Sequence, residues 1–140
     1  MKKYINLILL ILWMVLIFAM SSFDASESGN QSGFIVNLIG DIFNIRDLEL
    51  LSFIIRKLAH ITEFMILGIL TINCFKDYKF NNLLLLSVIF GIFYACTDEF
   101  HQIFVSGRSG SIKDVCIDSF GVLMGTYGYY LAIIRNKIKQ

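Results

Sequence analysis

The sequence contains no proline and few charged residues. Only 16% of its 140 residues are charged, whereas 56% are hydrophobic, and the mean hydropathy is +0.70. Soluble domains have about 25% charged and about 45–50% apolar residues, so this chain has too little polar surface for an aqueous fold. The composition predicts an all-α membrane protein and excludes a separate soluble catalytic domain.

The chain also lacks a strong net charge and a cysteine motif. Its formal net charge is +1 and its charges are scattered, so the sequence offers no basic face to which nucleic acid would bind. Cys74, Cys96 and Cys116 stand singly in apolar segments, without the spacing of a metal-binding ribbon. We expect them to be small buried residues rather than members of a disulfide.

Four apolar runs are long enough to be membrane-spanning helices, each of which needs roughly 20 mainly apolar residues. They cover about residues 4–20, 51–75, 83–100 and 115–134 and form a single domain over residues 1–140. The first run could be a cleaved signal, because Ala19, Met20 and Ser21 resemble a cleavage site. It is slightly longer than the usual signal core, which favours a retained helix.

The positive charges predict the orientation of these spans. Seven of the twelve Lys and Arg residues lie on one side: Lys2, Lys3, Lys76, Lys79, Arg135, Lys137 and Lys139. The other five lie on the opposite side with ten of the eleven acids. Since Lys and Arg gather in cytoplasmic loops, both termini are predicted to be cytoplasmic.

The segment between the first and second spans is predicted to be exterior. Residues 21–29 are polar and predict a flexible loop. Apolar residues then recur at helical spacing, at Ile35, Leu38, Ile39, Ile42 and Ile45. This pattern predicts an amphipathic helix, which either lies on the outer membrane surface or folds onto the exterior ends of the spans.

Polar residues form stripes at the exterior ends of the later three spans. The stripes are Arg56, His60 and Glu63; Ser87, Gly91, Tyr94, Asp98 and His101, with Glu99 and Gln102 beside them; and Asp114, Asp118, Gly121, Gly125 and Gly128. At 3.6 residues per turn, the members of a stripe share one helix face. Ionisable residues in membrane helices usually face the bundle interior. The stripes therefore predict a polar cavity on the outer side, closed at depth by closely packed glycines.

The loop between the third and fourth spans contains groups that could bind an anion. Glycines let backbone N–H groups approach a ligand, and Arg108 supplies a planar fork suited to phosphate or carboxylate. Ser111 and Asp114 resemble a capping box at the start of the fourth span, whose N-terminus would favour an anion. The alternative is an ordinary turn in which Arg108 pairs with an acid such as Asp98, Glu99 or Asp114.

A divalent metal site is a second interpretation of the same cluster. His60 and Glu63 form a His-x-x-Glu pair, which Glu99, His101, Asp114 and Asp118 could complete. Such an ion could activate water against a lipid-linked phosphate or ester. The candidate catalytic residues are His60, Glu63, Asp98, Glu99 and His101. Against a metal, nearby basic residues could neutralise these acids.

Two motifs resemble the VanZ-like family of small integral membrane proteins. The first is residues 56–64, RKLAHITEF, and the second is residues 98–111, DEFHQIFVSGRSGS, which continues through Asp114, Asp118, Gly121 and Gly125. Ser21 and Ser22 are similar to an exterior serine pair of the family. Many members have Gln, Pro and Asn where Phe23, Ser106 and Asp118 stand here.

The resemblance implies a multi-pass protein of the bacterial cytoplasmic membrane, in a family whose namesake lowers susceptibility to teicoplanin. It implies no particular reaction. The matched positions are candidate ligand-binding residues: Lys57, His60, Glu63, Asp98, Glu99, Gln102, Arg108, Asp114 and Asp118. The partners implied are membrane lipids and either a lipid-linked cell-wall precursor or a lipoglycopeptide. The alternatives are a metal-dependent hydrolase or transferase, and a structural subunit in which the polar cluster only joins helices.

Overall fold

The computed structural model describes residues 2–23 and 25–138, and in this part of the chain it contains five helices and no strand. The helices are α1 (Lys2–Ser21), α2 (Ala25–Phe43), α3 (Leu48–Asp77), α4 (Leu83–Gln102) and α5 (Ile112–Ile138). Four of them, α1, α3, α4 and α5, are long and apolar enough to cross a membrane. The predicted all-α membrane fold is confirmed.

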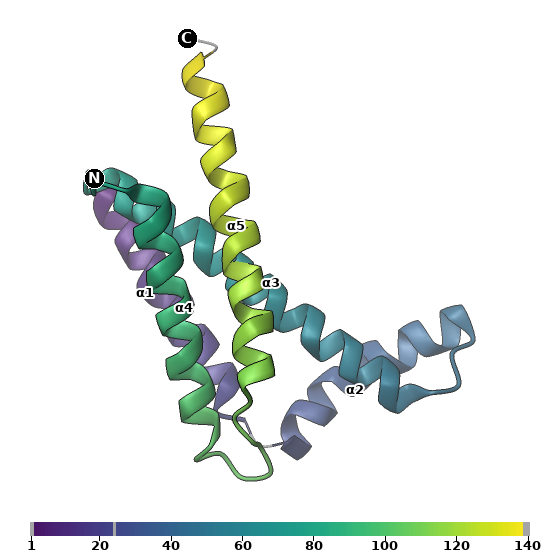
Figure 1. Cartoon of the computed structure of the whole chain (residues 1–140). Helices are drawn as coiled ribbons and strands as arrows, with labels where there is room; N and C mark the ends of the chain where they lie inside the picture. The colour runs from purple at the N-terminus through teal and green to yellow at the C-terminus, as the bar shows by residue number, and fades with distance from the viewer. Residues whose placement is uncertain (1, 24, 139–140) are drawn as a thin grey trace.

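The four long helices form a bundle whose two ends differ (Figure 1). Both termini lie at one end, together with the turn between α3 and α4, whereas the α1–α2 and α4–α5 connections lie at the other. There α3 extends obliquely away from the other spans and contacts α2. We refer to the end with the α4–α5 loop as the loop end.

Helix α2 corrects one expectation. Residues 25–29 were predicted to be a flexible loop, but they begin a helix that continues to Phe43. Ala25, Glu27 and Gln31 are good helix formers, and no proline separates them from the amphipathic segment, so one helix covers both. Only its later part, Gly33–Phe43, is apolar.

One face of α2 packs on α3. Val36 is 4% exposed, and a Cβ on Gly40 would lie 2.8 Å from the Leu48 side chain. Of the two placements open from the sequence, this contact favours a helix folded onto a span. The opposite face leaves Phe34 and Ile42 exposed, as in a helix that also contacts lipid.

The glycines of α5 allow it to approach α3 closely. A Cβ on Gly121 would lie 2.5 Å from the Ile61 carbonyl oxygen, and a Cβ on Gly125 would overlap the Met65 carbonyl oxygen. This contact closes the bundle below the loop end, as the glycine spacing predicted. Gly128 has no atom within 4 Å of the corresponding position, because α5 has by then diverged from α3.

Helix α1 is held in the bundle by buried contacts and hydrogen bonds. Ile17 is fully buried in the core. The Trp13 indole N–H donates to the Glu63 carbonyl oxygen at 2.9 Å, and the Tyr94 hydroxyl donates to the Met14 carbonyl oxygen at 2.6 Å. The first apolar run therefore packs as a full member of the helix bundle.

All three cysteines are free, but only Cys74 is buried. Cys96 and Cys116 are exposed, so the expectation that they are buried was wrong. In a membrane helix an apolar residue can face lipid instead of the bundle, because the bilayer interior is itself apolar.

Candidate ligand-binding site

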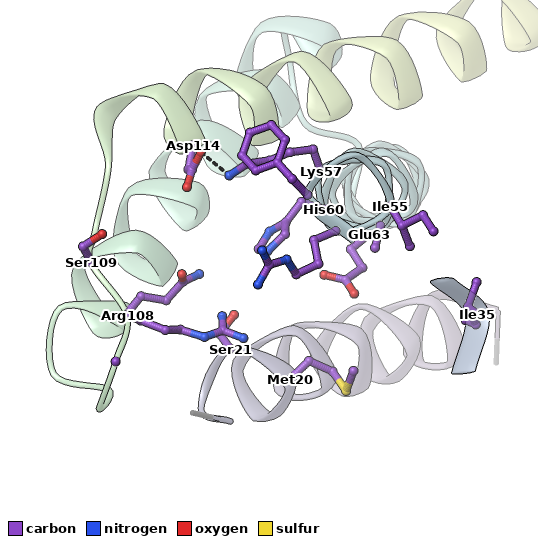
Figure 2. Close-up of a pocket in the computed structure, with 15 residues that line it drawn as sticks. Met20, Ser21, Ile35, Ile55, Lys57, His60, Glu63, Arg108, Ser109 and Asp114 are labelled. Carbon is purple, nitrogen blue, oxygen red and sulfur yellow. Dashed lines mark hydrogen bonds and ion pairs between the residues drawn. The ribbon is translucent and has the colours of Figure 1, made fainter. Parts of the chain in front are cut away.

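A cavity of about 440 Å³ opens at the loop end of the bundle. Its walls come from the end of α1, one residue of α2, the first half of α3, the end of α4, the α4–α5 loop and the first turn of α5 (Figure 2). The lining residues are Met20, Ser21, Ile35, Phe53, Ile55, Arg56, Lys57, Ala59, His60, Glu63, Gln102, Gly107, Arg108, Ser109 and Asp114. The polar stripes thus converge at the end of the bundle where the sequence placed them.

The stripe on α3 supplies most of the ionisable wall. Arg56, His60 and Glu63 all line the cavity, as their spacing predicted. The neighbouring Lys57 places its Nζ 2.5 Å from Oδ1 of Asp114 in the first turn of α5. This ion pair joins α3 to α5 beside the cavity (Figure 2).

The α4–α5 loop is fixed to α4 by Ser111 and Gly110. The Ser111 backbone N–H donates to Oε2 of Glu99 at 2.9 Å. A Cβ on Gly110 would lie 2.6 Å from the Glu99 carbonyl oxygen, so this contact needs a glycine. The Ser111 hydroxyl accepts from the Lys113 N–H at 3.2 Å, whereas Asp114 binds Lys57 and does not reach back to the cap. The predicted capping box is therefore only half formed.

Arg108 extends from this loop across the mouth of the cavity toward Ser21 (Figure 2). The expected alternative was an ion pair with Asp98, Glu99 or Asp114. In the part of the chain that the structure describes, Arg108 forms no such pair. Its guanidinium is therefore free to bind a ligand.

Three carboxylates are buried beside the cavity. Asp98 and Glu99 on α4 and Asp118 on α5 have 2%, 4% and 0% of their surface exposed. Oδ2 of Asp98 accepts hydrogen bonds from the Ser21 hydroxyl at 2.8 Å and from the Gln102 amide at 3.0 Å. Sequence reasoning did not assign Ser21 this role, because no sequence spacing relates α1 to α4.

Most of the remaining carboxylate oxygens have no partner. Oδ1 of Asp98, Oε1 of Glu99 and both oxygens of Asp118 are buried without a hydrogen bond among the described residues. Unpaired buried acceptors are rare, because each loses its hydration without compensation. These oxygens are consequently available to an additional group.

His60, Asp98 and Asp118 lie close enough together to share one ligand. One possible ligand atom from each lies within 4.8 Å of the others, and His60 Nδ1 is 3.4 Å from Asp118 Oδ1. Among residues 2–23 and 33–135, whose side chains the structure describes, no other group of three metal-ligating side chains meets this spacing. Each of the three comes from a different membrane-spanning helix.

This group differs from the donor set predicted from sequence. Of the additional donors proposed for His60, only Asp118 is in the group. Asp114 pairs with Lys57, Glu99 binds the Ser111 backbone, and Glu63 lines the cavity beside His60. The His101 ring packs on Phe18, with the ring centroids 4.1 Å apart, so His101 faces α1 rather than the cavity.

Comparison with known proteins places the chain in a family. No curated protein and no solved structure matches it. A family model described as VanZ/LLP1 matches residues 6–134, which include all four membrane-spanning helices almost entirely and the whole cavity wall. The chain therefore belongs to the VanZ/LLP1 family.

Proposed function

We propose that this multi-pass membrane protein binds an anionic, lipid-linked molecule of the bacterial cell envelope, or a lipid-bearing glycopeptide, at the outer face of the cytoplasmic membrane. The observation that carries the proposal is the cavity at the loop end, with the unpaired Arg108 across its mouth. A guanidinium presents two parallel N–H donors, which suit a phosphate or carboxylate better than a single ammonium does.

The charges on the cavity wall favour an anionic group at the mouth. Lys57 and Asp114 neutralise each other across 2.5 Å. Arg56 and Arg108 also line the cavity, and neither forms an ion pair with a described residue. Of the unpaired charges on this wall, two cations therefore face one acid, Glu63.

The apolar part of the wall suits the lipid portion of such a ligand. Met20, Ile35 and Ile55 line the cavity from three different helices (Figure 2). On the adjoining α2, Phe34 is 75% exposed. A lipid chain could pass along these side chains into the bilayer while its charged head group contacts Arg108.

The distribution of Lys and Arg supports placing the loop end outside. The opposite end carries Lys2, Lys3, Lys76 and Lys79, and the sequence of the C-terminal segment adds a further run of basic residues. Cytoplasmic loops are enriched in such residues, so this end faces the cytoplasm in our proposal and the cavity opens toward the envelope.

Binding at this site is proposed to lower susceptibility to teicoplanin-type glycopeptides, either by occupying a lipid-linked target or by holding the drug. We expect a sensitive Gram-positive host to become less susceptible when it expresses the wild type, but not when it expresses Arg108→Ala or Asp114→Ala. Lys113→Ala removes a cation at the start of α5 that does not line the cavity, and it should protect like the wild type.

Membrane abundance of each variant is measured by immunoblot alongside susceptibility. Equal abundance with loss of protection only in Arg108→Ala and Asp114→Ala supports the proposal. A well-expressed wild type that leaves susceptibility unchanged contradicts the resistance role. Loss of protection that follows abundance indicates instead a structural role for the polar cluster.

A metal-dependent hydrolase or transferase acting on a lipid-linked substrate is the second candidate function. The convergence of His60, Asp98 and Asp118 favours it, because a metal held there could activate water. Release of inorganic phosphate from an anionic lipid phosphate by the purified protein, lost in Asp118→Asn, would support this candidate. Absence of turnover with divalent metal supplied would reject hydrolysis of that substrate.

A further inference from the structure

We propose that His60, Asp98 and Asp118 form a binding site for one divalent metal ion. The three residues come from α3, α4 and α5, and one donor atom of each lies within 4.8 Å of the others. The site is therefore built by tertiary packing of three helices and not by one local motif. It goes beyond the proposed lipid binding, which is carried by Arg108 and the cavity mouth.

The unpartnered oxygens of Asp118 favour binding of a cation. Asp118 is fully buried, and neither of its carboxylate oxygens has a hydrogen-bond partner among the described residues. Asp98 is only 2% exposed, and its Oδ1 likewise has no hydrogen-bond partner among the described residues. A buried carboxylate is costly unless it is paired or coordinates a metal.

The nearby protein cations do not supply this compensation. Lys57 is paired with Asp114, and neither Arg56 nor Arg108 forms an ion pair with a described acid. Among the side chains that the structure describes, His60 is the one basic group within salt-bridge distance of Asp118, with its Nδ1 3.4 Å from Oδ1. One imidazole faces two carboxylates, so a doubly charged ion would balance the group.

The spacing of the donors is close to that of a coordinated ion. Two donors bound to one ion at about 2.0–2.2 Å lie no more than about 4.4 Å apart. Since the three donors lie within 4.8 Å, a small side-chain rotation brings them to this spacing. One nitrogen and two oxygens suit Zn²⁺ or Mn²⁺ better than Cu⁺, which prefers sulfur ligands.

Neighbouring residues hold one of the ligands in place. The Ser21 hydroxyl and the Gln102 amide donate to Oδ2 of Asp98, which leaves its Oδ1 for the ion. Such hydrogen bonds to the non-coordinating atom orient metal ligands in proteins. His60 also lines the cavity, so the ion would be reached from there.

The same ion would make the cavity more suitable for an anion. Three carboxylates, those of Asp98, Glu99 and Asp118, are buried beside it and would repel a phosphate or carboxylate group. A divalent cation removes this repulsion and offers a coordination position to an anionic oxygen. This consequence rests on the proposed function, whereas the metal site itself does not.

The test measures metal bound by the full-length protein, purified in detergent after exposure to Zn²⁺ or Mn²⁺ and extensive dialysis. We expect about one equivalent in the wild type by inductively coupled plasma mass spectrometry. Asp118→Asn and Asp98→Asn keep the side-chain shape, and each should bind at least about tenfold less metal than the wild type. Asp41→Asn removes an exposed acid from α2 and should bind as the wild type does.

Each outcome decides the proposal. The proposal is overturned if the wild type binds less than about 0.1 equivalent of both Zn²⁺ and Mn²⁺. It is also overturned if Asp118→Asn and Asp98→Asn both still bind the metal as the wild type does. Should those variants fail to fold, a metal-induced rise in the melting temperature of the wild type that EDTA reverses supports the site, and no rise overturns it. Arg108→Ala should retain the metal, so loss of lipid binding and loss of metal are distinguishable.

Discussion

Two neighbouring serines at the end of α1 have different surroundings. Ser21 is 3% exposed and its hydroxyl donates to Asp98 on α4. Ser22, one residue beyond the end of α1, is exposed and its hydroxyl donates to the Phe18 carbonyl oxygen of that helix. Adjacent positions on a helix point about 100° apart, so only one of the pair can face the bundle.

We predict that Ser21→Ala destabilises the protein by about 1 kcal/mol, because a buried carboxylate loses one of its two donors. Ser22→Ala is the matched control and should change stability by less than about 0.5 kcal/mol. Chemical unfolding in detergent, followed by circular dichroism, measures both. Equal effects of the two substitutions would contradict the assignment of Ser21 as a structural partner of Asp98.

Some residues of the site could be predicted from sequence and others could not. Arg56, His60 and Glu63 share a helix face by spacing alone, and all three line the cavity. His101 was placed on a stripe with Asp98, yet it packs on Phe18. Helical periodicity predicts only which broad face of a helix a side chain occupies. The packing of the neighbouring helix then decides which side chains on that face reach the cavity.

At the scale of elements, the contact between α3 and α5 depends on glycine. Gly121 and Gly125 face carbonyl oxygens of Ile61 and Met65 with no room for a Cβ. Close approach of this kind allows extensive van der Waals packing, the main source of association between helices in lipid. It also sets the distance between His60 on α3 and Asp118 on α5.

We predict that Gly125→Ala destabilises the bundle by about 2 kcal/mol or more, since α5 must move away from the Met65 carbonyl oxygen. Gly128→Ala adds the same methyl group in open space on the same helix, where alanine's higher helix propensity makes it neutral or slightly stabilising. Thermal unfolding in detergent compares the two. A Gly125→Ala protein as stable as Gly128→Ala would contradict the close α3–α5 contact.

The elements themselves were largely predictable because apolar runs of membrane length have few other solutions. The predicted run over 51–75 became a helix from Leu48 to Asp77, which Asp47 caps by accepting the Leu50 N–H at 3.0 Å. The early part of α2 was missed because its polar composition resembles that of a loop. The sequence did not predict that α2 packs on α3, because the spacing of Ile and Leu predicts an apolar face but not what covers that face.

At the scale of the whole molecule, the account requires the loop end to lie outside. The two connections at this end and the termini at the other follow from four spans crossing in alternate directions. The hydrogen bond from Asn6 to Asp77, 2.5 Å long, further ties the start of α1 to the end of α3. The proposed role of the cavity at the outer face depends on this orientation, whereas the metal site does not.

We predict that a membrane-impermeant maleimide labels Ser106→Cys in intact cells, because Ser106 is exposed in the α4–α5 loop. Asn81→Cys, exposed between α3 and α4, should react only after the membrane is made permeable. Both substitutions are made in a chain whose three native cysteines are replaced. Labelling of Asn81→Cys alone in intact cells would reverse the orientation and reject an outer-face site.

The most direct measurement of the central claim is lipid binding by the purified protein, followed by native mass spectrometry. The wild type is predicted to retain phosphatidylglycerol at least about tenfold more strongly than phosphatidylcholine, a difference of about 1.4 kcal/mol. Arg108→Ala should lose this preference, and Lys113→Ala, a cation outside the cavity wall, should keep it. A wild type without preference for the anionic lipid, or an Arg108→Ala protein that retains it, would contradict the account.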